Sequence, residues 1–160
     1  MPEVTKSDTI DWKTVRIAVV AAKWNSFITD EMLKGAVDAL KGKGIPEEQI
    51  YQLRCPGSFE LPLASKYCLD ELNVHGVVAI GAVIRGGTPH FDYVCDAVTR
   101  GITDLNMASG KPVAFGVLTT DTVEQAVERA GIQKGNKGAE AALSACEMIE
   151  LQRAVKESGS

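Results

Sequence analysis

The sequence lacks the cysteine and histidine patterns that hold metal ions. Its two histidines are His75 and His90, and its four cysteines stand far apart, with no CxxC pair among them. The usual ligand spacing of a zinc site is therefore absent, and we expect no metal. We expect buried free thiols in a reducing compartment for the cysteines, which are Cys55, Cys68, Cys95 and Cys146.

An excess of positive charge and a long apolar run are also missing. The 17 Lys and Arg residues are outnumbered by 21 Asp and Glu residues, which gives a net charge of −4. This balance argues against a nucleic-acid or membrane-surface partner. No apolar run is long enough to cross a membrane, and the first residues lack the apolar core of a signal peptide. We therefore expect a soluble, cytoplasmic protein.

The sequence does contain a regular alternation of apolar runs and segments with helical periodicity. Four short apolar runs are typical of buried strands: 15–22, 49–55, 75–84 and 112–120. Helical spacing follows each run, which predicts a parallel sheet covered by helices on both faces. The pattern predicts a single α/β domain over residues 15–155, with a loose or edge-strand segment at 1–14 and a flexible tail at 156–160.

Helix-end preferences predict where two of these helices begin. Pro62 is tolerated only in the first turn of a helix, so it fixes the start of the helix expected within 58–72. Asp121 and Glu124 form a capping pair for the short helix that Gly131 ends.

The carboxyl ends of the strands are the expected ligand-binding edge of such a sheet. After the third strand, Arg85, Gly86, Gly87, Thr88 and His90 occur within six positions. Open amides at a helix start favour an anion, and a histidine that titrates near neutral pH suits general acid/base catalysis. Two alternatives stay open, because glycines can serve only the positive φ of a turn and the histidine can make a helix-start contact. The P-loop and GxGxxG motifs are absent, which disfavours those modes of nucleotide binding.

Aromatic residues and a carboxylate lie near the same edge. Trp24 and Phe59 follow strands and Phe115 lies within the fourth strand, where a ring can stack on a flat heterocycle or pack in the core. Glu60 can orient N–H or hydroxyl groups of a ligand, or complement a helix dipole.

For three further residues, the sequence gives weaker evidence of a functional role. His75 precedes the third strand, at the opposite edge of the sheet, so a structural role is favoured. Arg129 and Lys137 flank a turn rich in cations, where they are either solvated charges or ligands of an anion.

Five motifs occur in one order along the chain: Trp24-Asn25, PGSFELP, GAVIRGGTPHFDYVCDAV, PVAFGVLTT and AGIQKGNKG. Together they resemble the lumazine synthase family over residues 15–155. The resemblance implies a flavodoxin-like, three-layer αβα sandwich around a four-stranded parallel sheet, to which an N-terminal segment can add a strand.

The resemblance implies the penultimate step of riboflavin biosynthesis. In this step 5-amino-6-(D-ribitylamino)uracil condenses with 3,4-dihydroxy-2-butanone 4-phosphate to give 6,7-dimethyl-8-ribityllumazine, phosphate and water. No metal and no organic cofactor is implied.

The resemblance also assigns roles to individual residues. His90 matches the proton-transfer residue, and the phosphate is bound by Gly87, Thr88 and Arg129. The pyrimidine and its ribityl chain are contacted by Trp24, Ser58, Phe59, Glu60, Ala82, Val83, Ile84, Phe115 and Lys137. Phe115 and Arg129 are expected to act from the neighbouring subunit.

The same resemblance implies that the chain forms an oligomer. The family forms pentamers, and in some members twelve pentamers build a hollow icosahedral shell. The turn GIQKGNKG has the short length seen in shell-forming relatives, so we expect a sixty-subunit homo-oligomer. Riboflavin synthase is a further candidate partner.

Two other functions stay open at this point. A non-catalytic flavin- or lumazine-binding relative would keep the pocket without turnover, although retention of His90 and Arg129 argues against it. A flavodoxin-like signalling domain would carry an acidic cluster after the first strand, where this chain has Lys23-Trp24-Asn25.

Residues 85–90, which we call the phosphate corner, depart from the family pattern at two positions. Gly87 stands where many members carry a larger residue, and Pro89 lacks a backbone donor just before the histidine. Both changes bear on how tightly the phosphate is held.

Overall fold

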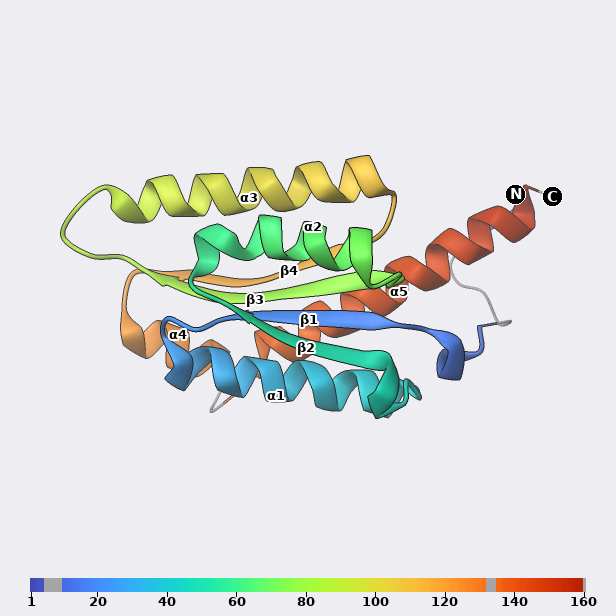
Figure 1. The fold of residues 1–160 in the computed structure, drawn as a ribbon, viewed down its shortest axis with the longest axis horizontal. Coiled ribbons are helices and arrows are strands. Elements are labelled where there is room, and N and C mark those ends of the chain that lie inside the picture. Colours follow the sequence, from blue (N-terminus) through green and yellow to red (C-terminus); the bar gives the residue numbers. More distant parts are fainter. Residues whose placement is uncertain (5–9, 132–134, 160) are drawn as a thin grey trace.

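A four-stranded parallel sheet lies at the centre of the chain, with the strands in the order β2-β1-β3-β4 (Figure 1). The computed structural model describes residues 1–4, 10–131 and 135–159. The strands are β1 (Ile17–Ala22), β2 (Ile50–Cys55), β3 (Gly76–Ile84) and β4 (Val113–Thr120). Each lies within the apolar run that predicted it, so the predicted parallel sheet is confirmed.

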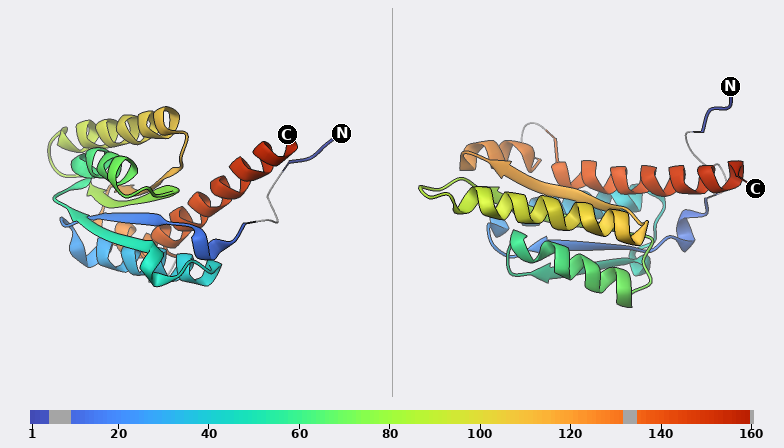
Figure 2. Two further views of the ribbon diagram at one scale, coloured as in Figure 1. Left: turned by 45° about the vertical axis from the view of Figure 1, so that its right-hand side comes forward. Right: turned by 90° about the horizontal axis from the view of Figure 1, so that it is seen from above.

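Helices cover both faces of this sheet and make three layers (Figure 2). One face is covered by α1 (Ser26–Lys43), α4 (Val123–Arg129) and α5 (Lys137–Ser158). The other is covered by α2 (Leu61–Glu71) and α3 (His90–Ser109). Short 3₁₀ helices are η1 (Trp12–Thr14), η2 (Glu47–Gln49) and η3 (Ser58–Glu60). This arrangement confirms the three-layer α/β fold.

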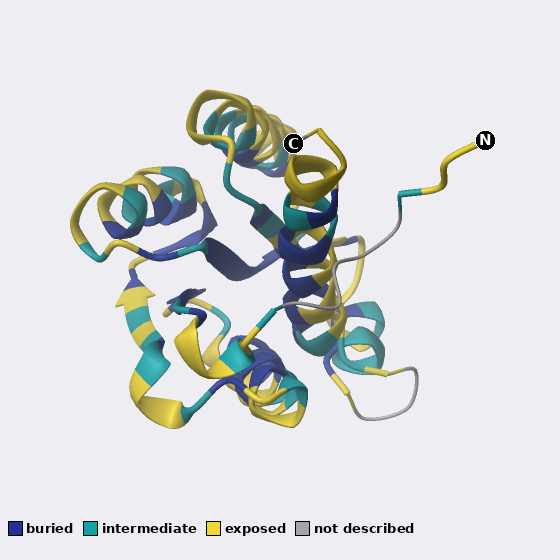
Figure 3. Ribbon diagram, turned by 90° about the vertical axis from the view of Figure 1, so that its right-hand side faces the viewer, coloured by how far each residue is buried: buried dark blue, intermediate teal, exposed yellow. Residues whose placement is uncertain are grey.

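The core is divided by the sheet into two parts, because successive strand residues point to opposite faces. In β1, Ile17 and Val19 pack toward α1 and α5, whereas Ala18 and Val20 pack toward α2 and α3. All four side chains are fully buried, which explains why the run is apolar at every position rather than alternating. Figure 3 shows the buried residues along the strands and the inner faces of the helices.

The start of α5 is fixed against α1 by a close approach. A Cβ at Gly138 would lie 2.0 Å from the carbonyl oxygen of Met32, so only glycine fits at this contact. Beside it, Asn136 caps α5 by accepting a hydrogen bond from the Ala139 amide at 3.0 Å, and its Nδ2 donates to the Glu31 carbonyl at 2.9 Å. These contacts hold the first turn of α5 in place.

The observed helix ends confirm one prediction and correct another. Pro62 lies in the first turn of α2, as predicted. The cap of α4, however, is Thr122 rather than Asp121: its Oγ1 accepts a hydrogen bond from the Gln125 amide at 3.1 Å. The Asp121 carboxylate instead forms an ion pair with Arg85, so it does not cap the helix.

The C-terminal end of the chain differs from its predicted structure, whereas the N-terminal segment is described only in part. Residues 156–158, expected in the flexible tail, are the last turn of α5. In the N-terminal segment, residues 1–4 and 10–16 contain no strand, and residues 5–9 lie outside the described part of the chain. Both termini lie at the end of the molecule away from the strand carboxyl ends (Figure 1). In the described residues, no helix is both long and apolar enough to cross a membrane.

The half-buried His75, at the edge of the sheet opposite the ligand edge, has structural partners. His75 Nδ1 accepts a hydrogen bond from the Arg16 amide at 3.0 Å, and the His75 amide donates to the Arg16 carbonyl at 2.8 Å, so its structural role is confirmed. The four cysteines are free thiols, and all except the half-buried Cys95 are buried.

Candidate active site

A crevice is expected at the carboxyl ends of β1 and β3, because the strand order reverses there. The chain moves from β1 outward to β2, then returns across β1 to β3 and β4, and such switch points bind ligands in α/β sheets. The pairing of β1 with β3 stops at Ile80, whereas β3 continues beside β4 as far as Ile84. The main chain of residues 82–84 therefore has no strand neighbour on its β1 side and can bond a ligand there.

Asn25 joins the two sides of this crevice. It adopts a left-handed conformation (φ 62°) between β1 and α1, which asparagine tolerates better than most residues. Its Nδ2 donates to the Ala82 carbonyl at 2.9 Å. Asn25 was not among the predicted site residues, although an asparagine directly after a strand and before a helix is the local signal for this conformation.

Trp24 directly precedes Asn25 between β1 and α1. The amides of Lys23 and Trp24 donate to the carbonyls of Cys55 and Pro56 at 2.8 and 3.1 Å, so the β1–β2 pairing is extended past the strand ends. These bonds place the indole against Gly57, where a Cβ would lie 2.3 Å from ring atom Cε3. The indole nevertheless stays 65% exposed, which leaves a flat apolar surface open for stacking.

Residues Ser58–Glu60 form the 3₁₀ helix that follows β2. Ser58 is buried against Gly81, where a Cβ would lie 2.4 Å from the serine Oγ, whereas the Phe59 ring is exposed. Glu60 is half-buried, and its Oε2 is shielded from water without a hydrogen-bond partner in the described chain. A buried acceptor without a partner is costly, so this oxygen is suited to receive a hydroxyl or N–H from a ligand.

The corner between β3 and α3 is open to solvent at the strand carboxyl ends (Figure 1). Gly86 and Gly87 have no positive φ, and a Cβ at either would meet no atom within 4 Å, so turn geometry does not explain these glycines. The His90 amide lies 3.4 Å from Thr88 Oγ1, at the first residue of α3. The His90 residue is exposed, and this amide contact is the backbone contact that the structural alternative predicts for a helix-start histidine, so the role of the imidazole stays a prediction.

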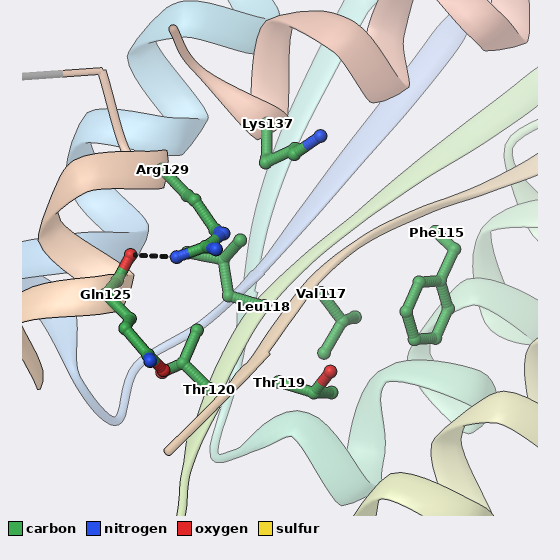
Figure 4. A pocket seen from close by; sticks show the side chains of 8 residues that line it. All are labelled: Phe115, Val117, Leu118, Thr119, Thr120, Gln125, Arg129 and Lys137. Carbon is green, nitrogen blue, oxygen red and sulfur yellow. Dashed lines mark hydrogen bonds between the residues drawn. The ribbon is translucent and has the colours of Figure 1, made fainter. Parts of the chain in front are cut away.

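A second hollow lies along the outer edge of β4, which has no strand neighbour on that side (Figure 4). Its volume is about 350 Å³. Arg129 and Lys137 reach it from α4 and α5, and Phe115 and Thr119 border it from the strand. Arg129 is oriented by a 3.0 Å hydrogen bond from its Nη1 to the Gln125 carbonyl.

The predicted residues thus fall into two groups on different sides of the β3–β4 pair. Residues after β1, β2 and β3 lie at the switch point where the crevice is expected, while Phe115, Arg129 and Lys137 line the hollow at the outer edge of β4. None of the first group lines that hollow. Thr119 and Gln125 also line it and are not among the predicted site residues, although Thr119 lies within the motif PVAFGVLTT.

Among the described residues, no three His, Cys, Asp or Glu side chains gather where they could hold a metal ion. The one cysteine near the crevice, Cys55, donates its thiol proton to the Gly57 carbonyl at 3.4 Å, and burial raises its pKa to about 11. A thiol with a pKa this high remains protonated at neutral pH and is unsuited to be a nucleophile.

The strand order and the helices on both faces place this chain among the flavodoxin-like, three-layer α/β proteins (Figure 2). Its sequence matches the family described as 6,7-dimethyl-8-ribityllumazine synthase over residues 14–153. It is also 51% identical, over 151 residues, to a 6,7-dimethyl-8-ribityllumazine synthase of Halorhodospira halophila (strain DSM 244 / SL1). That alignment covers 94% of this chain and 97% of the relative. The chain therefore belongs to the 6,7-dimethyl-8-ribityllumazine synthase family.

Proposed function

We propose that the chain condenses 5-amino-6-(D-ribitylamino)uracil with 3,4-dihydroxy-2-butanone 4-phosphate to form 6,7-dimethyl-8-ribityllumazine, phosphate and water. The observation that carries this proposal is the family match over residues 14–153, which spans every candidate site residue from Trp24 to Lys137. This step belongs to riboflavin biosynthesis, and the cytoplasm is its proposed location.

The pyrimidine substrate is proposed to bind in the switch-point crevice. The exposed indole of Trp24 offers a stacking surface for the flat ring. In the proposed contact with residues 82–84, Ala82 and Ile84 direct backbone N–H and C=O groups to the unpaired side for the polar edge of the ring, whereas Val83 lies between them with its backbone groups toward β4. One of these, the Ala82 carbonyl, already accepts a bond from Asn25, so it has capacity for at most one more.

The ribityl chain is proposed to contact Ser58, Phe59 and Glu60. Its hydroxyl groups are hydrogen-bond donors, and Glu60 Oε2 is a shielded acceptor without a partner in the described chain. A hydroxyl that bonds this oxygen would relieve the cost of its burial, which supports the assignment.

The phosphate is proposed to bind at Gly87 and Thr88, beside His90. Exposed backbone there, the Thr88 hydroxyl and the start of a twenty-residue helix all favour an anion. Pro89 contributes no N–H, so the amides on either side of it carry this role.

The proposed chemistry needs proton transfers at every step and no covalent nucleophile. The 5-amino group adds to the ketone and water leaves, phosphate is then expelled β to the resulting imine, and the ribitylamino nitrogen closes the ring with loss of water. The exposed His90 imidazole can donate and accept these protons, a contribution of about 10²–10⁴-fold in rate. Cationic and amide groups around the leaving phosphate stabilise its charge.

The proposed site is completed by a neighbouring subunit, which supplies Phe115, Arg129 and Lys137. Supporting this, the three residues line a hollow at the open edge of β4, on the side away from the crevice. A ring in which the β4 edge of one chain faces the crevice of the next would bring both groups together, and heterologous contacts of this kind close into rings.

A pentamer, and a shell of twelve pentamers, is the proposed assembly. Five chains of 17.1 kDa each would give a ring of about 85 kDa. Light scattering that finds a mass near sixty chains supports the shell, whereas an isolated ring overturns it. Riboflavin synthase is the proposed macromolecular partner, and co-purification tests that separately.

The activity is tested by mixing both substrates with the purified protein and following lumazine fluorescence together with free phosphate. We expect one phosphate released per lumazine formed. Failure to form either product would overturn the proposed function, and the pyrimidine alone serves as the blank.

A further inference from the structure

Arg85 is the basic residue that begins the phosphate corner, yet its side chain, although 46% exposed, has three partners within the chain. Its Nε lies 2.8 Å from Asp121 Oδ1, its Nη1 lies 3.6 Å from Asp92 Oδ1, and its guanidinium carbon lies 4.4 Å from the centre of the Phe91 ring. The guanidinium therefore has partners on two carboxylates and one aromatic face, an arrangement that suits arginine better than lysine.

These partners hold both ends of the corner. The Arg85 amide donates to the Thr120 carbonyl at 2.9 Å, which continues the β3–β4 pairing by one residue. Phe91 and Asp92 directly follow His90 in the first turn of α3. Between these ends, Gly86 and Gly87 have no packing that a Cβ would meet. The shape of the corner is therefore determined at its ends, and Arg85 contacts both of them.

Polar contacts also connect Arg85 to Arg129 in α4. Asp121, the partner of Arg85, donates its amide to the Gln125 side chain at 2.9 Å. The Gln125 carbonyl in turn accepts the 3.0 Å hydrogen bond from Arg129. A continuous chain of polar contacts thus runs from Arg85 to Arg129 by way of Asp121 and Gln125.

We propose that Arg85 is a positioning residue, which orients both the Gly87–His90 corner and Arg129 while leaving the phosphate itself to other groups. This inference rests on the function proposed above. If sites are completed by neighbouring subunits, the corner and Arg129 of one chain serve two adjacent sites. The contact chain through Asp121 then links adjacent sites within each subunit.

The competing role for Arg85 is direct binding of the phosphate, and the Asp121→Asn variant separates the two. The variant keeps the arginine and its charge but weakens the ion pair that orients it. A positioning role predicts that Asp121→Asn shows the same defect as Arg85→Ala. A direct ligand would be released from its carboxylate partner, so phosphate would bind equally well or more tightly.

The experiment measures kcat and the KM of each substrate separately for wild type, Arg85→Ala, Arg85→Lys and Asp121→Asn. Inhibition by inorganic phosphate provides an independent measure of anion binding. Arg100→Ala is the matched control, because Arg100 forms an exposed Arg–Asp pair with Asp96 on the same helix, away from the corner. Light scattering and the melting temperature show whether each variant folds and assembles.

We expect the KM of the phosphate substrate to rise on the order of 10-fold in Arg85→Ala and Asp121→Asn, with an unchanged KM for the pyrimidine. Arg85→Lys should recover only part of the loss, and Arg100→Ala should behave as wild type. Wild-type kinetics in Asp121→Asn, or tighter inhibition by phosphate, would overturn the inference even if Arg85→Ala failed to fold. An inactive wild-type protein would instead contradict the proposed function itself.

Discussion

The two sides of the candidate site use glycine for opposite reasons. Beside the proposed pyrimidine position, Cβ atoms at Gly57 and Gly81 would lie 2.3 Å from the Trp24 ring and 2.4 Å from Ser58 Oγ. Beside the proposed phosphate position, Gly86 and Gly87 have nothing within 4 Å of a Cβ, and neither has a positive φ.

This difference shows which parts of the site one chain can shape alone. The pyrimidine side is defined by close contacts between three strand ends, so its geometry is fixed before a ligand arrives. The phosphate side is an exposed corner whose packing contacts lie at its ends, and in the proposed function its remaining contacts come from the ligand and a neighbouring subunit. Substitutions on the two sides should therefore change different properties, such as kcat and the KM of the pyrimidine substrate.

The largest expected effect is on the open side. His90→Ala removes the proposed proton carrier, so kcat should fall by about 10²–10⁴-fold. Because the imidazole is exposed and has no partner in the described chain, the melting temperature and the assembly mass should not change. A variant with the wild-type kcat would remove His90 from the mechanism.

A smaller effect is expected on the closely packed side. In Gly57→Ala the new methyl group would displace the Trp24 indole, so the KM of the pyrimidine substrate should rise about 10-fold, within the usual range for loss of a stacking contact. The exposed indole can swing aside, so the cost in unfolding free energy should stay below the about 1–3 kcal/mol of an overpacked core. Steady-state kinetics with the pyrimidine varied checks this, and an unchanged KM would contradict the stacking role.

The matched change on the open side should have nearly no effect on the pyrimidine. Gly87→Ala meets no atom and no unfavourable φ, so it should stabilise the fold slightly, by about 0.4–1 kcal/mol, through the unfolded state. Denaturant unfolding and kinetics measure both. If Gly87→Ala impaired pyrimidine binding as much as Gly57→Ala, the contrast between the two sides would be wrong.

The smallest effect concerns the cysteines near each side. Burial raises the pKa of Cys55 from its ordinary 9.0 to about 11 and also raises the pKa of the half-buried Cys95, so iodoacetamide at pH 8 should modify Cys95 first. Because folding favours the protonated Cys55 thiol, its contribution to stability is complete below pH 9 and is lost as pH rises toward 11. Mass spectrometry of the alkylated peptides tests the order, and prior modification of Cys55 would contradict it.

Much of the fold was predictable because the local signals for the strands and for the start of α2 agreed with the final structure. The four apolar runs became the four strands, and Pro62 marked the first turn of α2. The cap of α4 was assigned to Asp121 because local preference could not reveal its distant ion-pair partner Arg85, while Thr122 took the cap.

The sequence proposes the candidate site as a set of residues, whereas the geometry of that set was not predictable. Strand-end position and the family resemblance selected Trp24 and His90. The free edge of β3 depends on its register with β1, and the bond from the left-handed Asn25 to Ala82 joins residues 57 positions apart in the sequence. Sequence spacing alone carries no information about either contact.

In the proposed assembly, each active site combines the crevice of one subunit with the β4 edge of the next. Co-assembly of the His90→Ala and Arg129→Ala variants tests it most directly. Each variant alone should be impaired, whereas an equal mixture refolded together should regain activity at roughly a quarter of its sites, where an intact crevice meets an intact neighbour. A mixture no more active than the two separate variants would contradict the shared site.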